Sequence, residues 1–547
     1  MALVLVSCAT LVLAGQGRDL STIDDLREAE VAREMFVSGE FVIPTLAGLP
    51  FLEKPSGFPV IVALAYRSTG GPSVVAARLV AAGFALAALA SVFFLGMRMG
   101  GPPCAAASTV VLALSAMFVR TSHEILLDNA LTASVGCAVM GAWCGLAAAE
   151  NRRRLPWFAV AGASLGFAFL FKGFVGPSIF LAGIVPYLLL ARRWKELRFL
   201  VHPVPILSFL AVAALWVIPF LLRSTPEQRY EFFVSNHLGR AASAYHSHEG
   251  PLWYYFETLT YRFAPGVLLL PLAAIGAWRG RKTAAGSAAL YALCGAAGPM
   301  LLLSLLRAKD AVYLLPAYPA FSVLVGTWCS KTFAEPDRLA RGALGTGAVL
   351  AVLVAGIAIG FTAAKEGVRV QSLASALGWS VGLGLLARAI RTRSVPGQSS
   401  LLGGFLALAG IQTVVGPISE IDMARHVPWR PGTRALMKAA EGRELFLYLP
   451  DDRLRGALGF YRNRTAIEVR DERDLTDRLQ QDPKAWVVMA VHGRDLPRAV
   501  LEAAAARGIV LRETFRAPYF DAELVAFGVE GSAALTNTDS SHLADRP

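Results

Sequence analysis

The sequence predicts a mainly α-helical, polytopic membrane protein that ends in a small soluble α/β domain. Of its 547 residues, 55% are hydrophobic and only 17% are charged, and the mean hydropathy is +0.51. Apolar runs of about 20 residues, the length that a helix needs to cross a bilayer, recur before Glu420. After Glu420, short apolar runs alternate with charged helical patterns, which is typical of a soluble α/β fold.

Short basic clusters lie between the apolar runs and indicate how the helices are threaded. The net charge of +12 is explained by the positive-inside rule and does not indicate nucleic-acid binding. Threading predicts about 13 transmembrane helices in the cytoplasmic (inner) membrane, with the N-terminus in the cytoplasm and the C-terminal domain in the periplasm or outside the cell. The predicted spans are 1–14, 74–97, 103–119, 130–149, 156–171, 176–191, 200–222, 264–278, 284–306, 311–328, 342–363, 371–390 and 400–418.

The predicted domain organisation follows from this threading. The transmembrane domain covers 1–419, with outer loops at 15–73 and 223–263; the α/β domain covers 420–530, and 531–547 is predicted to be a disordered tail. The first apolar run is shorter than a full span, so it reads either as a signal-peptide core or as a start-truncated first helix, and we favour the helix. The six cysteines fall in or beside apolar spans, which indicates neither disulfides nor a CxxC metal site.

The first outer loop is densely charged, which is unusual in so apolar a chain. Its spacing predicts an amphipathic juxtamembrane helix with charged residues on one face and apolar residues toward the lipid. An interfacial helix without a function would explain the amphipathicity, but it would not explain two adjacent acids close to the end of a transmembrane span. The acids are Asp24 and Asp25, the charged face is Arg27, Glu30 and Glu34, and the lipid-facing residues are Val31, Met35 and Phe36.

Further charged motifs occur where other outer turns are expected. Lys54 precedes Pro55, which restricts its backbone and suits a rigid phosphate-binding position. Asp128 lies at the start of a predicted span, so it is interpreted either as a helix cap or as a functional acid. Lys172 ends an apolar run and is followed by Gly173, so it either reaches the interface or binds an anionic ligand. Lys309 and Tyr313 repeat this arrangement at the last outer turn.

The large outer loop is rich in histidine and aromatic residues. The aromatic residues are typical of the interfacial belt. His246 and His248, with Glu53 or Glu249 as a third donor, are weak candidate ligands for zinc or another divalent ion. No other cofactor is indicated.

In order and spacing, these motifs resemble the polyprenyl-phosphate-dependent glycosyltransferases of the GT-C fold. The resemblance is greatest to the lipid A aminoarabinose transferases and the protein O-mannosyltransferase-like (glycosyltransferase family 39-like) group, and it extends from about Gly17 to Ala320. It is carried jointly by DDLREAEVAREM, FLEKP, ILLDNALT, FLFKGFVGP, FFVSNHLGR with HSHEGPLWYYF, and AKDAVYLLPAYP. The chain departs from the family pattern at Asp25, Glu28 and Phe51, which places the identity of the acceptor in question more than the type of donor.

The resemblance implies an inverting membrane transferase. It would move a sugar from undecaprenyl phosphate to a lipid A-like glycolipid, an envelope glycan or a protein on the outer face of the membrane. It implies catalytic roles for Asp24 and Asp128 and a supporting role for four other residues. The expected donor-phosphate ligands are Arg27, Lys54, Lys172, Arg240 and Lys309, and the supporting residues are Asp25, Glu30, Glu53 and Tyr313.

Two other classes of function are consistent with a polytopic chain. A secondary transporter or flippase of a lipid-linked sugar would place ionisable residues near the membrane midplane. A non-catalytic scaffold would tolerate exchange of the loop acids. The crowding of charged residues at one predicted face favours the enzyme, and neither the sugar nor the acceptor is specified by the sequence.

Overall fold

The computed structural model describes residues 2–14, 16–239, 249–264, 266–283, 286–334, 429–491, 498–519 and 522–530. The chain divides into two compact units, each built from more than one stretch of sequence. Unit 1 comprises Met1–Asp19, Glu40–Ile43 and Phe51–Met423, and unit 2 comprises Leu20–Gly39, Pro44–Pro50 and Ala424–Pro547.

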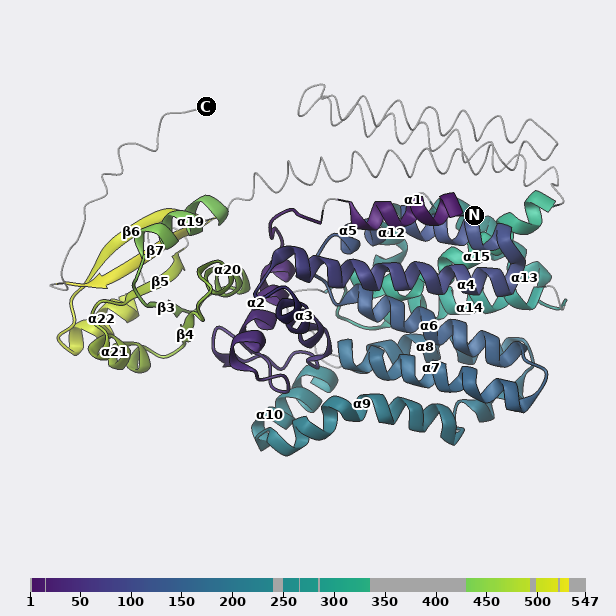
Figure 1. Cartoon of the computed structure of the whole chain (residues 1–547), viewed down its shortest axis with the longest axis horizontal. Helices are drawn as coiled ribbons and strands as arrows, with labels where there is room; N and C mark the ends of the chain where they lie inside the picture. The colour runs from purple at the N-terminus through teal and green to yellow at the C-terminus, as the bar shows by residue number, and fades with distance from the viewer. Residues whose placement is uncertain are drawn as a thin grey trace, which may run out of the picture. The chain divides into compact units, whose positions relative to one another are not determined.

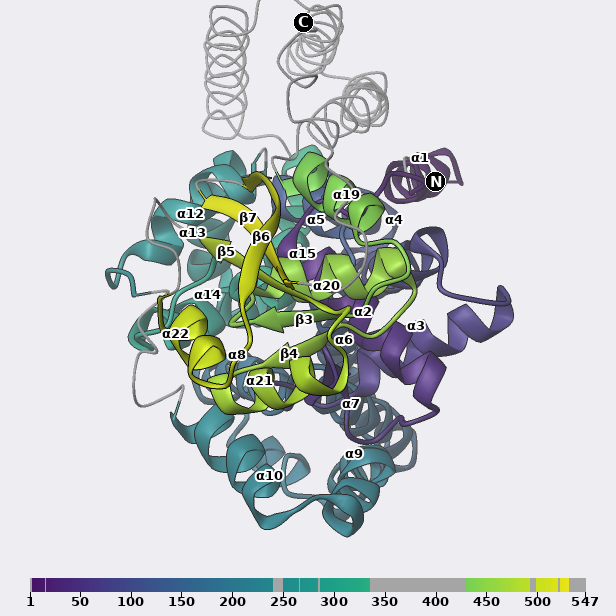
Figure 2. The same ribbon diagram turned by 90° about the vertical axis from the view of Figure 1, so that its left-hand side faces the viewer.

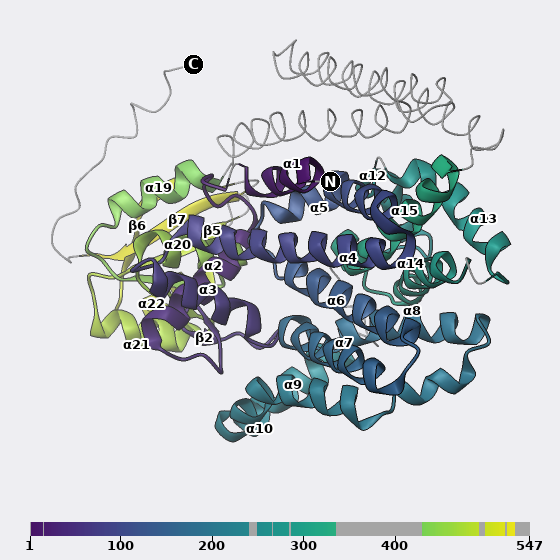
Figure 3. The same ribbon diagram turned by 45° about the vertical axis from the view of Figure 1, so that its right-hand side comes forward.

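Unit 1 is a bundle of apolar helices. Helix α4 packs on α6, α6 on α7 and α7 on α9, and α15 returns to pack on α4 (Figures 1 and 3). The elements are α1 (Ala2–Leu13), α3 (Gly57–Ser68), α4 (Val74–Leu114), α5 (Ala116–Ser122), α6 (Asp128–Ala147), α7 (Asn151–Lys172), α8 (Val175–Leu190), η1 (Trp194–Phe199), α9 (Pro203–Arg223), α10 (Pro226–Tyr230), η2 (Glu231–Gly239), α12 (Tyr254–Arg262), η3 (Gly266–Leu269), α13 (Leu270–Gly280), α14 (Ser287–Leu305), η5 (Ala311–Ala317) and α15 (Tyr318–Ala334).

The first ten predicted spans each coincide with helix in the structure. Within the described residues, six helices are long and apolar enough to cross a membrane, or seven if the bent pair α12 and η3–α13 forms one span. The last three predicted spans, the boundary at 419/420 and the tail lie outside the described residues. All six cysteines are free thiols.

The helix α4 contains the predicted span 74–97, most of the predicted span 103–119 and the turn between them. The break falls at Gly101, whose φ of +71° and ψ of −164° suit only glycine, and Pro102 and Pro103 follow directly. Because each proline lacks an N–H, the second helical segment starts anew after the glycine. The expected turn between 97 and 103 is therefore present as a kink.

Unit 2 is a five-stranded mixed sheet with helices on both faces (Figures 1 and 2). The strand order is β4-β3-β5-β7-β6, in which β3 pairs in parallel with β4 and β5, and β7 pairs antiparallel with β5 and β6. Helices α21 and α22 share one apolar core with alternate sheet residues such as Val487 and Val525. The elements are α2 (Ile23–Ser38), β1 (Thr45–Leu46), β2 (Leu49–Pro50), α19 (Trp429–Ala439), β3 (Leu445–Tyr448), α20 (Asp452–Arg462), β4 (Ile467–Val469), α21 (Glu472–Gln481), β5 (Trp486–Val491), α22 (Arg498–Ala506), β6 (Leu511–Tyr519) and β7 (Ala522–Val529).

The charged helix of the first loop, α2, belongs to this second unit and packs against α20. Val31 and Met35 are each only 1% exposed. The prediction that these two side chains face lipid is therefore wrong. Their apolar face is buried because α2 is a structural helix of a compact unit, and the glycines of α20 allow a close approach, since a Cβ on Gly456 would lie 2.7 Å from the Leu26 carbonyl carbon.

Candidate active site

Unit 1 brings Asp128 and Lys172 together as a buried ion pair. Asp128 is the first residue of α6, Lys172 is the last residue of α7, and Lys172 Nζ donates to Asp128 Oδ1 at 2.6 Å. Their side chains are 4% and 13% exposed. Asp128 does not cap its helix, because the N-cap position is Leu127 and no side chain caps it. Because both side chains are largely shielded from solvent, the attraction between these two charges is stronger than it would be in water.

Tyr313 completes this cluster from the short helix η5. Lys172 Nζ lies 4.8 Å from the centre of the Tyr313 ring, within range of a cation–π interaction. Asp310 fixes the start of η5 because its carboxylate accepts from the Val312 N–H at 3.0 Å. Three residues predicted from separate motifs, Asp128, Lys172 and Tyr313, thus meet at one place in unit 1.

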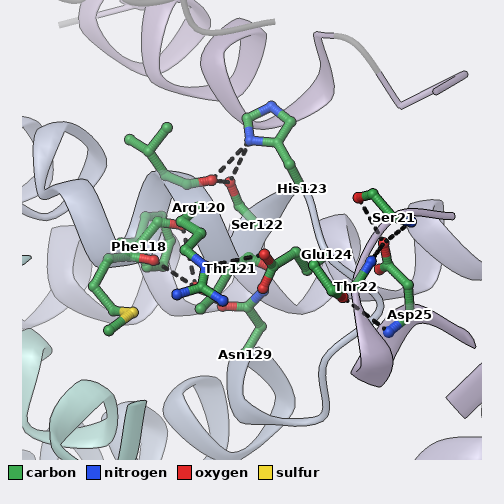
Figure 4. Close-up of polar contacts among 12 residues, drawn as sticks. Ser21, Thr22, Asp25, Phe118, Arg120, Thr121, Ser122, His123, Glu124 and Asn129 are labelled. Carbon is green, nitrogen blue, oxygen red and sulfur yellow. Dashed lines mark hydrogen bonds and ion pairs between the residues drawn. The ribbon is translucent and has the colours of Figure 1, made fainter. Parts of the chain in front are cut away.

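The turn before Asp128 is held by hydrogen bonds of its side chains. Asn129 donates to the Thr121 carbonyl at 2.6 Å and accepts from the Thr121 hydroxyl at 3.1 Å (Figure 4). Arg120 Nε donates to Glu124 Oε1 at 3.0 Å across the same turn. These contacts fix the start of α6, and with it the position of the Asp128 carboxylate.

Arg78 is a positioning residue that the sequence analysis missed. It is fully buried near the start of α4, and it donates to the backbone carbonyls of Arg18 at 3.1 Å, Asp19 at 3.0 Å and His123. It therefore ties the segment that follows α1 to the turn before α6. The sequence pattern that could have identified Arg78 is a lone arginine inside an otherwise apolar predicted span. A charged side chain there is costly unless it is paired or has a function.

The segment that carries Glu53 and Lys54 lies against the end of α7. A Cβ on Gly57 would lie 2.6 Å from the Leu170 carbonyl oxygen, two residues before Lys172, so only glycine permits this approach. The Leu52 carbonyl accepts from Asn236 Nδ2 at 3.0 Å. Glu53 and Lys54 are both half-buried. The motif around Lys54 is thus part of the same region of unit 1 as the end of α7.

Substitution of Gly57 by alanine is expected to separate α3 from α7. Because the nearest atoms are backbone, the helices must move, at a cost of about 1–3 kcal/mol, and Lys54 would move with them. The thermal unfolding midpoint of the purified chain measures this loss. Gly71→Ala is the matched control, because a Cβ there has nothing within 4 Å. Equal midpoints for the two variants would contradict the packing argument.

Lys309 is placed differently from the other lysines. Its ammonium group donates to the carbonyls of Leu303 at 3.0 Å, Ser304 at 2.6 Å and Leu306, at the end of α14. The residue is 3% exposed, and burial lowers the pKa of its ammonium group. Its three hydrogens are thus used to cap a helix C-terminus, which favours a structural role over phosphate binding.

In unit 2 the two adjacent acids have different surroundings. Asp25 is fully buried and forms a capping box with Thr22, since its own N–H donates to Thr22 Oγ1 at 3.1 Å and its carboxylate accepts from the Thr22 N–H at 3.5 Å (Figure 4). The carboxylate also accepts from the Ser21 N–H at 3.1 Å. Asp24 has a side chain that is 40% exposed and pairs with Arg27. Arg27 also contacts Asp452 Oδ2 at 3.4 Å. Asp24 is therefore the acid of the pair that is accessible for chemistry.

The other charges of α2 hold unit 2 together. Arg33 makes two 2.7 Å hydrogen bonds to the Glu30 carboxylate and one of 3.2 Å to Thr465 Oγ1. Glu34 accepts from the Gly48 N–H at 3.3 Å and from the Thr45 hydroxyl in the β1–β2 hairpin. Much of the charge in this loop is thus structural.

Glu30 gives unit 2 a pH-dependent stability. Burial raises the pKa of Glu30 from 4.5 to about 8, more than the pairing with Arg33 lowers it. The folded state therefore binds a proton more tightly than the unfolded state, so stability falls as pH rises from about 4.5 to about 8. Glu30→Gln is expected to reduce this dependence by several degrees in the unfolding midpoint. Parallel pH profiles of the native chain and the variant would contradict this.

Two predicted sets of ligands fall outside the described residues. These are the phosphate ligand Arg240 and the metal candidates His246 and His248. The described part of the chain contains no group of three or more His, Cys, Asp or Glu side chains that could hold a metal ion. The zinc prediction, with Glu53 or Glu249 as the third donor, stays a prediction.

Comparison with known proteins places this geometry in a known fold. A crystal structure of ArnT from Cupriavidus metallidurans bound to undecaprenyl phosphate matches with a TM-score of 0.75 and 21% identity, over 97% of this chain and 98% of that chain. The chain has the GT-C fold of ArnT. The apo state of the same ArnT matches with a TM-score of 0.72 over 96% of this chain and 97% of that chain, again at 21% identity.

Sequence comparisons agree with the ArnT fold. A family model described as dolichyl-phosphate-mannose-protein mannosyltransferase matches residues 25–227. An undecaprenyl phosphate-alpha-4-amino-4-deoxy-L-arabinose arabinosyl transferase of Edwardsiella ictaluri is 30% identical over 59% of this chain and 58% of its own length. The same enzyme of Erwinia tasmaniensis is 30% identical over 55% of this chain and 54% of its own length. The chain thus spans little more than half of these curated relatives, and the resemblance inferred from the motifs is confirmed.

Proposed function

We propose that this chain is an inverting, multi-pass membrane glycosyltransferase that uses an undecaprenyl-phosphate-linked sugar. The observation that carries the proposal is the buried pair of Asp128 and Lys172 at the ends of α6 and α7, in a fold shared with an ArnT solved with undecaprenyl phosphate. A cation beside a lipid phosphate stabilises the charge that develops on the leaving group. The names of the relatives make 4-amino-4-deoxy-L-arabinose the first sugar to test.

In the proposed reaction, the bond between the anomeric carbon and the donor phosphate oxygen breaks as the acceptor oxygen attacks the opposite face. Lys172 and Lys54, with Arg27 and Arg240, stabilise the released phosphate. Asp24 takes the proton from an acceptor hydroxyl, or orients an acceptor that is already a phosphate. Asp128 keeps Lys172 in place and stabilises positive charge at the anomeric carbon.

The acceptor is proposed to be a lipid A-like glycolipid, an envelope glycan or a protein on the outer face of the cytoplasmic membrane. The arrangement of about 13 helices, a cytoplasmic N-terminus and an outer C-terminal α/β domain belongs to the same proposal, and the positive-inside rule supports it. Unit 2 carries Asp24, which is consistent with a role of that unit near the acceptor.

A secondary transporter or flippase is the alternative. It would place its ionisable residues at interrupted helices near the midplane. The charged pair in unit 1 instead joins the first residue of one span, Asp128, to the last residue of another, Lys172. Charges at helix ends favour an interfacial reaction over passage through the bundle.

Membranes that contain the full chain, supplied with undecaprenyl-phosphate sugars, test the proposal. Mass spectrometry of the lipids, glycans and proteins should find an endogenous acceptor that has gained one sugar. Membranes without the chain are the control. If no acceptor gains mass with any donor, the transferase proposal is wrong.

A further inference from the structure

A groove of about 220 Å³ extends along α7 and α8 in unit 1. Its lining runs from Pro177 near the start of α8 to Leu146 near the end of α6 and Glu196 in η1. Leu146 and Glu196 mark the end of the groove that is far from the Asp128 and Lys172 pair, because that pair joins the start of α6 to the end of α7. The 20 residues of α6 extend about 30 Å, which is the thickness of the hydrocarbon core. Neither Asp128 nor Lys172 lines the groove, and its polar end at Glu196 is distinct from the proposed donor site.

The wall of the groove is apolar. Apart from Glu196, its lining consists of hydrophobic side chains, prolines and one glycine from α6, α7, α8, α9 and the segment around η1. Two lining residues, Leu181 and Ile206, are 45% and 39% exposed, so the groove opens at the surface of the bundle. Its volume is below the roughly 300–1,000 Å³ of sites for whole drug-sized ligands, and suits part of one hydrocarbon chain.

A fixed ionic cluster lies at the polar end of the groove. The Glu196 carboxylate accepts from Arg154 at 3.1 Å and from Arg193 at 3.4 Å. Arg154 also donates to the Ala148 carbonyl at 2.7 Å, and Arg193 to the Leu146 carbonyl at 2.7 Å. The single lining carboxylate is therefore neutralised, and two arginines are held where α6 and α8 end.

The cluster leaves an excess of positive charge. Phe199 stacks on Phe158 with ring centroids 4.6 Å apart, and the Arg198 guanidinium lies 5.1 Å from the centre of the Phe199 ring. The segments 150–154 and 192–198 at this end contain seven basic residues and two acids. The basic residues are Arg152, Arg153, Arg154, Arg192, Arg193, Lys195 and Arg198, and the acids are Glu150 and Glu196.

We propose that this groove binds an anionic glycerophospholipid of the cytoplasmic leaflet. One acyl chain occupies the apolar groove, and the phosphate contacts the basic cluster around Arg198. The positive-inside rule places such a cluster on the cytoplasmic side, where anionic headgroups are attracted by basic pockets between helices. Charge complementarity selects an anionic headgroup over a zwitterionic one, because the carboxylate at the groove is already paired.

Native mass spectrometry of the full chain in detergent tests this site with phosphatidylglycerol and phosphatidylcholine of equal chain length. One phosphatidylglycerol should be retained about five-fold or more tightly than phosphatidylcholine. Ile206→Trp should abolish this retention by filling the groove. Leu207→Trp is the matched control, because Leu207 is 62% exposed and does not line the groove.

The headgroup contact is tested separately by charge removal. Arg198→Gln should weaken phosphatidylglycerol retention about five-fold, whereas Arg279→Gln, in another basic cluster, should leave it unchanged. Unfolding midpoints equal to the native value show that each variant folds. Equal retention of both lipids, retention that survives Ile206→Trp in a folded chain, or displacement by undecaprenyl phosphate would each overturn the proposal.

Discussion

Asp24→Asn is expected to lower sugar transfer by about 10²–10⁴-fold, the usual contribution of a positioned general base. The Asp24 side chain is 40% exposed, and its partner Arg27 also contacts Asp452 Oδ2 at 3.4 Å, so the loss of Asp24 should change the unfolding midpoint little. Transfer per folded molecule, measured at equal expression, checks this. Transfer at the native rate would remove Asp24 from the mechanism.

The neighbouring acid provides the control. Asp25→Ala removes the capping box of α2, which should cost about 1 kcal/mol of stability. Asp25 is fully buried against the backbone, so its replacement should leave most of the activity of the folded molecules. Opposite phenotypes at adjacent positions would separate chemistry from folding. A strong loss of transfer in folded Asp25→Ala protein would contradict this assignment.

Lys172→Met is expected to have the largest combined effect. It leaves the Asp128 carboxylate buried without its cation, and breaking a buried pair costs about 3–5 kcal/mol. It also removes a ligand proposed for the donor phosphate. The unfolding midpoint and the affinity for undecaprenyl phosphate should therefore both fall, the affinity by more than about tenfold.

The double variant Asp128→Asn with Lys172→Met distinguishes the loss of stability from the loss of donor binding. Stability should recover in large part, because no unpaired buried charge remains. Binding of undecaprenyl phosphate and transfer should stay low, because the cation is still absent. Recovery of binding together with stability would show that Lys172 is only a structural partner of Asp128.

The helices of unit 1 were predictable because their signal is local. A run of apolar residues must form a helix in a bilayer, and charges such as Asp128 and Lys172 mark where a helix begins and ends. Their spacing along the chain located both residues correctly. That Lys172 contacts Asp128 and also lies over Tyr313 depends on how three separate helices pack, which one sequence does not specify.

The charged first loop shows the limit of this reasoning. Its acids suggest a reactive site because the rest of the chain is apolar, yet Glu34 holds α2 to the β1–β2 hairpin and Glu30 pairs with Arg33 within α2. Arg33 reaches Thr465, more than 400 positions later in the sequence. An amphipathic helix has the same periodicity whether its apolar face meets lipid or protein, so the burial of Val31 could not be read from the pattern.

Lys309 illustrates the same ambiguity for a single residue. A lysine at the end of an apolar run suits either an anionic ligand or the carbonyls of a helix terminus, since both present oxygen atoms. In the fold, the chain turns back after α14, and the Lys309 ammonium group donates to the carbonyls of Leu303 and Ser304 at the end of that helix.

A reaction of the purified chain in vesicles tests the transferase proposal most directly, with an undecaprenyl-phosphate-linked sugar labelled in the sugar as the donor and with the acceptor found by mass spectrometry in membranes. A glycosyltransferase breaks the bond between sugar and phosphate, so labelled sugar should pass to an acceptor, with undecaprenyl phosphate released in equal amount. Lys172→Met should reduce both products together. Movement of intact labelled lipid across the bilayer without release of undecaprenyl phosphate would contradict the transferase account and support transport.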